Sequence, residues 1–265
     1  VTFVYRTSPT CDALRAAVLR TGLTLIDGGA GGARRTLPPG ECAKRFVHEE
    51  EAAAAVAAAD YVLVATKRDA NPRVAEILDR ARPPATGAAP KVTAPVVLLQ
   101  NGLRAEEDLA ARLGTPRLVL PAVVALSATL DHATGEVLRS GLIRSIVLPG
   151  QPGLAWLLRA AGIGARSEAP DRLAAELRGK LMLNMLNGPN ALSGVPLGRM
   201  FLDRASCALA AGAMAELDAA YAALGLRSEP CAARWYPTAL WALSTGFGSW
   251  LLQALAAACR ALCGG

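Results

Sequence analysis

The chain has 265 residues, of which 52% are hydrophobic, 5% aromatic and 19% charged. Disordered chains are poor in apolar residues and highly charged, so this composition excludes a disordered chain. The length favours one large domain or two ordinary ones. The net charge of +6 comes from scattered basic residues without a block of like charges. Aromatic residues are too few to interleave with a basic stripe, so no nucleic-acid partner is expected, and a small anionic ligand explains the charge better.

The cysteines and histidines do not form the pattern of a metal site. The cysteines are Cys11, Cys42, Cys207, Cys231, Cys259 and Cys263, and the histidines are His48 and His132. No Cys-x-x-Cys pair occurs and the spacing matches no zinc site, so no metal is expected. Free, mostly buried thiols are typical of a reducing compartment, which predicts a cytoplasmic protein. An organelle address stays open, because the chain begins without Met and an earlier segment is expected.

Residues 235–259 contain no charge and have the length that crosses a bilayer. Pro237 and the stretch 246–249, which includes two glycines, interrupt this run. Buried or partner-facing helices are therefore favoured over a membrane span.

Short apolar runs alternate with helical stretches in the first part of the chain. Strands are expected at 1–5, 23–27, 61–65, 96–99, 118–125, 135–138 and 142–148. Helices are expected at 11–20, 49–59, 72–82, 105–113 and 153–161. Runs without charge, such as 61–65, fit strands that are buried on both faces. The alternation predicts a parallel α/β sheet.

The pattern changes near Pro170. Beyond it, residues 172–185, 205–224 and 238–262 have helical spacing, and no strand pattern stands out. The sequence therefore predicts an α/β domain at residues 1–168 and an all-helical domain at residues 169–265. Ligands of parallel sheets bind at the carboxyl ends of the strands, often where two domains form a cleft.

A glycine cluster follows the expected strand at 23–27. Gly29 and Gly31 would need a third glycine at the position of Arg34, and no Lys-Ser or Lys-Thr pair follows. The cluster therefore matches neither a dinucleotide-binding turn nor a phosphate loop, and a surface turn is the favoured interpretation.

Three polar residues follow expected strands. Arg6 follows the first strand, Lys67 the strand at 61–65, and Asn101 the strand at 96–99. Each residue alone fits a surface position or a turn. Together they mark the edge where parallel sheets bind ligands, and an arginine there accommodates the 2′-phosphate of NADP.

The helical part carries the sharpest signal. Lys180, Asn184 and Asn187 are spaced i, i+4 and i+7, which places them on one face of a continuous helix among apolar neighbours. A capped helix end near Gly188 and a snorkelling lysine are the alternatives. A lysine in a partly dry cleft can act as a general acid.

Four segments resemble the ketopantoate reductase (2-dehydropantoate 2-reductase) family in order and spacing. They are ADYVLVATK at 59–67, PVVLLQNGL at 95–103, AELRGKLMLN at 175–184 and NALSG at 190–194. The resemblance implies a Rossmann-like NADP-binding domain, followed by an all-helical domain for substrate binding and dimerisation. It further implies NADPH-dependent reduction of 2-dehydropantoate to pantoate, in pantothenate and coenzyme A synthesis.

The resemblance also implies roles for individual residues. Lys180 matches the catalytic lysine, which would protonate the developing alkoxide. Asn184 matches a substrate-binding asparagine. The next family asparagine aligns with Asn187, Gly188 or Asn190, and Asn187 is favoured for its spacing. Asn101 would contact nicotinamide and substrate. Arg6 and Lys67 would hold the 2′-phosphate.

The chain departs from the family pattern at both ends. The family's first strand and its Gly-x-Gly-x-x-Gly turn would precede Val1, and a serine-rich segment with an acidic residue would follow Gly265, so the expectation is a chain truncated at both ends. A related 2-oxoacid reductase, or a non-catalytic binding protein with the same fold, are the alternative functions. A homodimer is the expected assembly.

Overall fold

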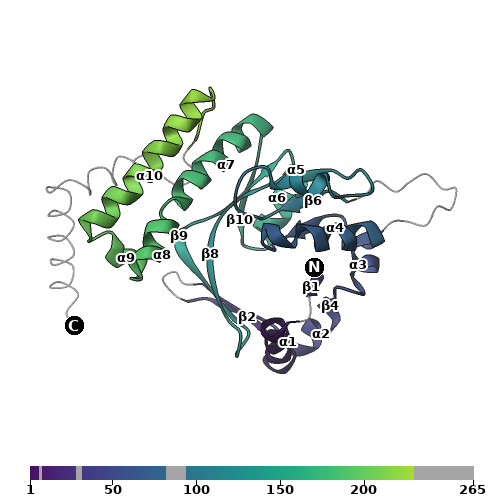
Figure 1. The fold of residues 1–265 in the computed structure, drawn as a ribbon. Helices are drawn as coiled ribbons and strands as arrows, with labels where there is room; N and C mark the ends of the chain where they lie inside the picture. Colours follow the sequence, from purple (N-terminus) through teal and green to yellow (C-terminus); the bar gives the residue numbers. More distant parts are fainter. Residues whose placement is uncertain (6–7, 28–31, 82–93, 230–265) are drawn as a thin grey trace, which may run out of the picture. The chain divides into compact units, whose positions relative to one another are not determined.

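The computed structural model describes residues 1–5, 8–27, 32–81 and 94–229 (Figure 1). The chain divides into two compact units, Val1–Ala169 and Pro170–Gly265. The first unit combines strands and helices, and the described part of the second consists of helices and their connections. This confirms the expected order of a Rossmann-like α/β region before an all-helical region.

The first unit contains a parallel sheet of three strands. Its strands are β5 (Val62–Val64), β6 (Val96–Leu98) and β7 (Val119–Pro121), in the order β5-β6-β7. The connections between them contain η1 (Arg68–Ala70), α4 (Asn71–Arg80) and α5 (Ala105–Ala110). All three residues of β6 are buried, which explains its uninterrupted apolar sequence.

The two faces of β6 pack against different hydrophobic clusters. Val96 and Leu98 join a cluster with α4, α5 and α3 (Ala52–Ala58), which includes Leu78 and Leu109. Val97 points to the opposite face and joins residues from around α6 (Pro152–Ala160). This alternation is the period of two that a strand requires.

A mixed sheet has the strand order β10-β9-β2-β3, with β8 also paired to β9. The strands are β2 (Leu23–Asp27), β3 (Arg34–Leu37), β8 (Val123–Asp131), β9 (Glu136–Pro149) and β10 (Gly164–Glu168). The first part of β9 pairs in parallel with β2, and its last part pairs in parallel with β10. The sequence prediction was wrong here in two places: the runs at 135–138 and 142–148 form one strand, and the run at 118–125 is divided between β7 and β8.

The beginning of the chain forms a small parallel pair, β1 (Phe3–Tyr5) with β4 (Phe46–His48). The helix α1 (Pro9–Thr21) starts where the Ser8 hydroxyl accepts a hydrogen bond from the Cys11 amide at 3.1 Å, with Pro9 as its first residue. It ends at Gly22, whose positive φ of 86° suits glycine. The helix α2 (Pro39–Arg45) follows β3.

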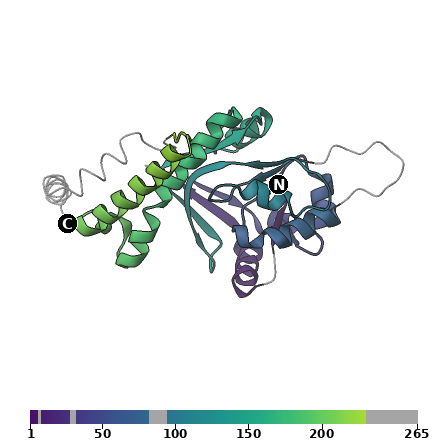
Figure 2. The same cartoon turned by 45° about the horizontal axis from the view of Figure 1, so that its top comes forward.

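The second unit contains α7 (Pro170–Asn184), α8 (Asn187–Ser193), α9 (Leu197–Met200) and α10 (Arg204–Ala223). Figure 2 shows α7 beside α10, where the Tyr221 hydroxyl donates to the Arg178 carbonyl at 3.4 Å. Met182, Met200 and Met214 are buried within this unit. The predicted helices at 172–185 and 205–224 are confirmed, and the helix predicted at 238–262 lies outside the described residues.

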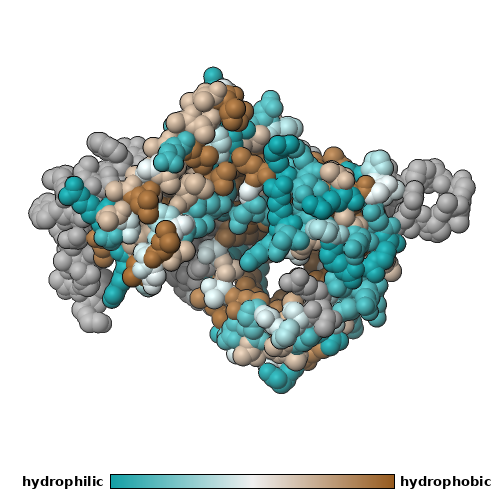
Figure 3. Space-filling view, viewed as in Figure 1, coloured by the Kyte–Doolittle hydropathy of each residue, from teal (hydrophilic) through white to brown (hydrophobic). Residues whose placement is uncertain are grey.

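Exposed hydrophobic side chains occur on both units. Figure 3 shows a mainly hydrophilic surface over α4 and α5 and brown, hydrophobic areas on the helices of the second unit, where Leu192, Leu209 and Leu224 are exposed. Within the described part of the chain, no helix is long and apolar enough to cross a membrane. The uncharged run at 235–259 lies outside that part.

Candidate functional site

Lys67 and Asn101 lie at the carboxyl edge of the parallel sheet. The register pairs Val64 with Leu98, so each of the two residues follows the last paired position of its strand by three residues. The Leu99 amide donates to the Val64 carbonyl at 2.8 Å, which extends this alignment beyond the strands. Both side chains are exposed. The two residues therefore follow neighbouring strands at the same edge of the sheet, and their role as a binding site stays a prediction.

The backbone around Lys67 begins a short helix. Lys67 has an extended conformation as the N-cap of η1, and its carbonyl accepts a hydrogen bond from the Ala70 amide at 3.1 Å. The side-chain amide of Gln100 donates to the same carbonyl at 3.4 Å. The loop that carries Lys67 is thus bonded directly to the residue before Asn101.

The turn after Asn101 has two residues with positive φ. Gly102 has a φ of 101°, and Arg104 has a φ of 61°. Arg104 is the only non-glycine residue with positive φ within the described ranges. Strained backbone of this kind clusters at functional sites, where the surrounding structure holds it in place.

The first turn of α5 is acidic. Glu106, Glu107 and Asp108 lie there, and a hydrogen bond from Arg104 at 2.7 Å holds the pKa of Glu107 below its ordinary value. Negative side chains at a helix N-terminus stabilise the helix and repel anions. A phosphate group would therefore be favoured on the Lys67 side of this edge rather than at α5.

Arg6 lies outside the described residues. The strand that precedes it, β1, ends at Tyr5 and pairs in parallel with β4. The glycine cluster, with Gly29 and Gly31, also lies outside them.

The helical unit carries the other predicted site residues. Lys180 and Asn184 are both in α7 and are partly exposed. Asn187 does not continue this helix: α7 ends at Asn184, a turn follows, and Asn187 is the first residue of α8. The predicted common face of three residues on one helix is therefore wrong for Asn187, because the chain leaves α7 before reaching it.

Asn190 has a structural partner. Its side-chain amide donates to the Val195 carbonyl at 2.8 Å, and its own carbonyl accepts from Gly194 and Ser193 at the end of α8. Gly194 has a φ of 64°, a left-handed cap of the usual type. This use of the Asn190 amide leaves Asn187, which is exposed, as the better candidate for a ligand.

Glu176 is a buried carboxylate in α7 that the sequence pattern did not identify as a site residue. It lies one turn before Lys180 in α7, and its residue exposure is only 2%. A carboxylate is costly to bury without partners, and the Arg172 guanidinium lies 3.9 Å from it. Glu176 and Lys180 are four residues apart among apolar neighbours, and this spacing could have identified Glu176 from the sequence.

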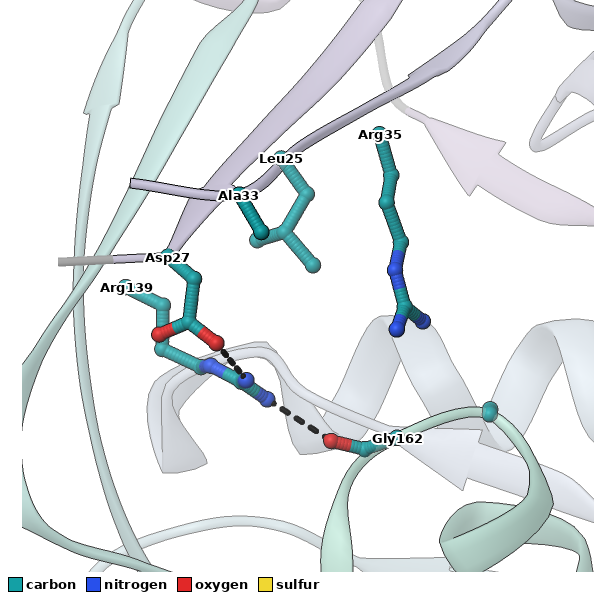
Figure 4. Close-up of a pocket in the computed structure, with 7 residues that line it drawn as sticks. Leu25, Asp27, Ala33, Arg35, Arg139 and Gly162 are labelled. Carbon is teal, nitrogen blue, oxygen red and sulfur yellow. Dashed lines mark hydrogen bonds and ion pairs between the residues drawn. The ribbon is translucent and has the colours of Figure 1, made fainter. Parts of the chain in front are cut away.

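A small hollow of about 30 Å³ opens elsewhere in the first unit. Figure 4 shows the Asp27 carboxylate bound to Arg139 at 2.6 Å, and Arg139 donating to the Gly162 carbonyl at 2.9 Å. None of the predicted site residues lines it. We interpret it as the surroundings of a structural ion pair between β2 and β9.

Within residues 1–5, 8–27, 32–81 and 94–229, no group of three or more His, Cys, Asp or Glu side chains is arranged to hold a metal ion.

Known structures share this fold. A PanE/ApbA family ketopantoate reductase from Ralstonia eutropha JMP134 has a TM-score of 0.64 and 23% identity, over 85% of this chain and 68% of its own. Yersinopine dehydrogenase in its apo form has a TM-score of 0.56 and 18% identity, over 86% and 58%. A dimeric ketopantoate reductase from Staphylococcus aureus has a TM-score of 0.55 and 13% identity, over 94% and 79%. No curated protein matches the sequence.

The family model described as ketopantoate reductase PanE/ApbA matches residues 1–150, which is more than half of the chain. This range includes β5, β6 and the edge with Lys67 and Asn101. The chain belongs to the ketopantoate reductase PanE/ApbA family, whose members are NAD(P)H-dependent oxidoreductases.

Proposed function

We propose that the protein reduces 2-dehydropantoate to pantoate with NADPH, a step in pantothenate and coenzyme A synthesis. The observation that carries the proposal is the common helix face of Lys180 and Asn184 within the segment that resembles the family's catalytic helix. The match of the family model to residues 1–150, in the first unit, also supports the proposal.

The residues at the sheet edge fit a phosphorylated dinucleotide. The Lys67 ammonium and the Asn101 amide are exposed at the same edge. A cation suits a phosphate group, and a neighbouring amide suits the carboxamide of the nicotinamide. Lys67 would hold the 2′-phosphate together with Arg6, and Asn101 would contact the nicotinamide and the substrate. NADPH supplies the hydride when it is bound.

Lys180 is the proposed general acid. Its ammonium would donate a hydrogen bond to the C2 carbonyl oxygen, stabilise the negative charge that develops there and transfer a proton to the alkoxide. Asn184 and Asn187 would orient the substrate through hydrogen bonds. The hydrogen bond from Lys180 would grow stronger as negative charge accumulates on the C2 oxygen. Catalysis requires such interactions, which are stronger in the transition state than in the ground state.

We further propose a cytoplasmic homodimer. Cys11, Cys42 and Cys207 are free thiols, as a reducing compartment would keep them. The similar ketopantoate reductase from Staphylococcus aureus is described as dimeric.

The test is NADPH oxidation by the purified chain, followed by absorbance with 2-dehydropantoate and with a panel of other small 2-oxoacids. The proposal predicts the highest kcat/KM with 2-dehydropantoate. A higher value with another oxoacid would assign a related reductase instead. Absence of turnover with every oxoacid, together with absence of NADPH binding by tryptophan quenching, would favour a non-catalytic binding protein.

A further inference from the structure

Two loops at the carboxyl edge of the parallel sheet are joined by buried side-chain amides. The Gln100 amide nitrogen Nε2 donates to the Asn71 oxygen Oδ1 at 2.8 Å and to the Lys67 carbonyl at 3.4 Å. The Asn71 nitrogen Nδ2 donates to the Asp108 carboxylate at 2.7 Å. The chain of bonds therefore runs from the loop after β6, through the start of α4, to the first turn of α5.

The amides are buried to a degree that packing alone does not explain. Asn71 is fully buried, and Gln100 is 8% exposed. Buried amides are costly unless they are hydrogen-bonded, and apolar side chains of similar volume would fill the same space without that cost. We therefore explain the network of buried amides by the groups that it orients, and not by a contribution to the stability of the fold.

The orientation of each amide is determined by the next group. The ionised Asp108 carboxylate only accepts, so Asn71 must turn its nitrogen toward Asp108 and its oxygen toward Gln100. Gln100 must then donate, and its oxygen Oε1 is left buried without a hydrogen-bond partner among the described residues. Hydrogen bonds from Arg112 and then Asn71 lower the pKa of Asp108, which keeps this anchor ionised.

Arg68 adds a second link between the same loops. Its guanidinium donates to the Leu103 carbonyl at 3.3 Å and lies 3.6 Å from the Asp108 carboxylate. Leu103 lies between Gly102 and Arg104, the two residues with positive φ. Arg68, which follows Lys67 directly, thus binds the turn after Asn101 at the position where the backbone of that turn is most strained.

We infer that Arg68, Asn71, Gln100 and Asp108 form a polar clasp that positions Asn101 and Lys67 relative to each other. The inference rests on the proposed function, because it assigns the clasp to a site where those two residues bind cofactor and substrate. The clasp residues are positioning residues, which act through the placement of Asn101 and the Lys67 backbone. A misplacement of about 1 Å at such a site costs about 10²-fold in rate.

Hydrogen exchange tests the clasp without any activity. Gln100→Met keeps the length of the side chain and removes the amide. Gln151→Met is the matched control, because the Gln151 side chain makes no capping hydrogen bond to α6. We expect faster exchange at residues 67–70 and 101–104 in Gln100→Met alone, with the β6 amides unchanged. Equal exchange in both variants would overturn the clasp. If Gln100→Met does not fold, Asn71→Leu provides the same comparison.

Kinetics then test the positioning role. Gln100→Met should lower kcat/KM by roughly tenfold or more. The same change in a background with both Asn101→Ala and Lys67→Ala should have little further effect, because a residue that acts through these two side chains loses its effect when both are absent. Additive losses would overturn the positioning role. A wild-type protein without reductase activity would overturn the proposed function, while the exchange result would still decide whether the clasp exists.

Discussion

Lys180 and Asn184 lie four residues apart in α7, so their side chains leave the same face of the helix. If Lys180 is the general acid, Lys180→Ala should lower kcat by roughly 10²-fold or more while NADPH affinity changes little. Steady-state kinetics and NADPH titration measure the two effects. Lys44→Ala is the control, because Lys44 is 74% exposed in α2 and pairs only with Glu41 there. Turnover that survives Lys180→Ala would contradict the mechanism.

Asn187 and Asn190 should separate substrate binding from helix capping. Asn187→Ala is expected to raise KM for the oxoacid with little change in stability, because Asn187 is exposed. Asn190→Ala removes the hydrogen bond to Val195 and should lower the free energy of unfolding by about 1 kcal/mol with KM unchanged. The reverse assignment of the two effects would show that Asn190 is the substrate residue.

Lys67 and Arg6 should discriminate between the two nicotinamide cofactors. Each alanine variant is expected to weaken NADPH binding by roughly tenfold or more and to leave NADH binding nearly unchanged, because only NADPH carries the 2′-phosphate. Fluorescence titration with both cofactors measures the ratio. Equal weakening for NADPH and NADH would exclude contact with the 2′-phosphate.

Gly22 should not tolerate a side chain. Its φ is 86°, and a Cβ there would lie 2.5 Å from the Leu37 carbonyl oxygen. Gly22→Ala is therefore expected to destabilise the protein by at least ~1–2 kcal/mol in urea unfolding. Gly40→Ala in α2 is the control, because a Cβ at that position meets no atom within 4 Å. A neutral Gly22→Ala variant would show that β3 does not approach this turn.

Acid should weaken the anchor of the clasp. Hydrogen bonds from Arg112 first and Asn71 second lower the pKa of Asp108 below its ordinary value of 3.8. A lowered folded-state pKa contributes stability above the unfolded-state pKa, and this contribution is lost as the pH falls through the folded-state pKa. The difference in unfolding free energy between wild type and Asp108→Asn should therefore shrink on acidification below about pH 4. A constant difference between pH 6 and pH 2 would contradict this assignment.

The sequence predicted the buried elements well and the exposed strands poorly. The run at 96–99 became β6, which is buried on both faces as its apolar sequence predicted. The run at 61–65 became β5, but burial on both faces was wrong for this strand, because Leu63 is 41% exposed. β3 and β10 have the sequences RRTL and GARSE, and no apolar pattern marks them. Their pairing comes from the neighbouring strands, which a local pattern does not contain.

The candidate site was predictable only where strand or helix spacing controls the position. Lys67 and Asn101 follow paired strands, so the register brought them to one edge. The prediction for Asn187 required α7 to continue, and the chain instead turns after Asn184. The clasp was not predictable, because Asn71 and Asp108 are 37 residues apart and meet only in the folded sheet.

The parallel pairing of β2 with β9 has a consequence for synthesis of the chain. Asp27 and its partner Arg139 are separated by 112 residues. At about 5–20 residues per second, β2 emerges from the ribosome roughly 6–22 s before β9 does. During that interval β3 can cover only one side of β2, and the other side exposes unpaired backbone groups. Expression at lower temperature or with a chaperone that binds extended segments should therefore raise the soluble yield.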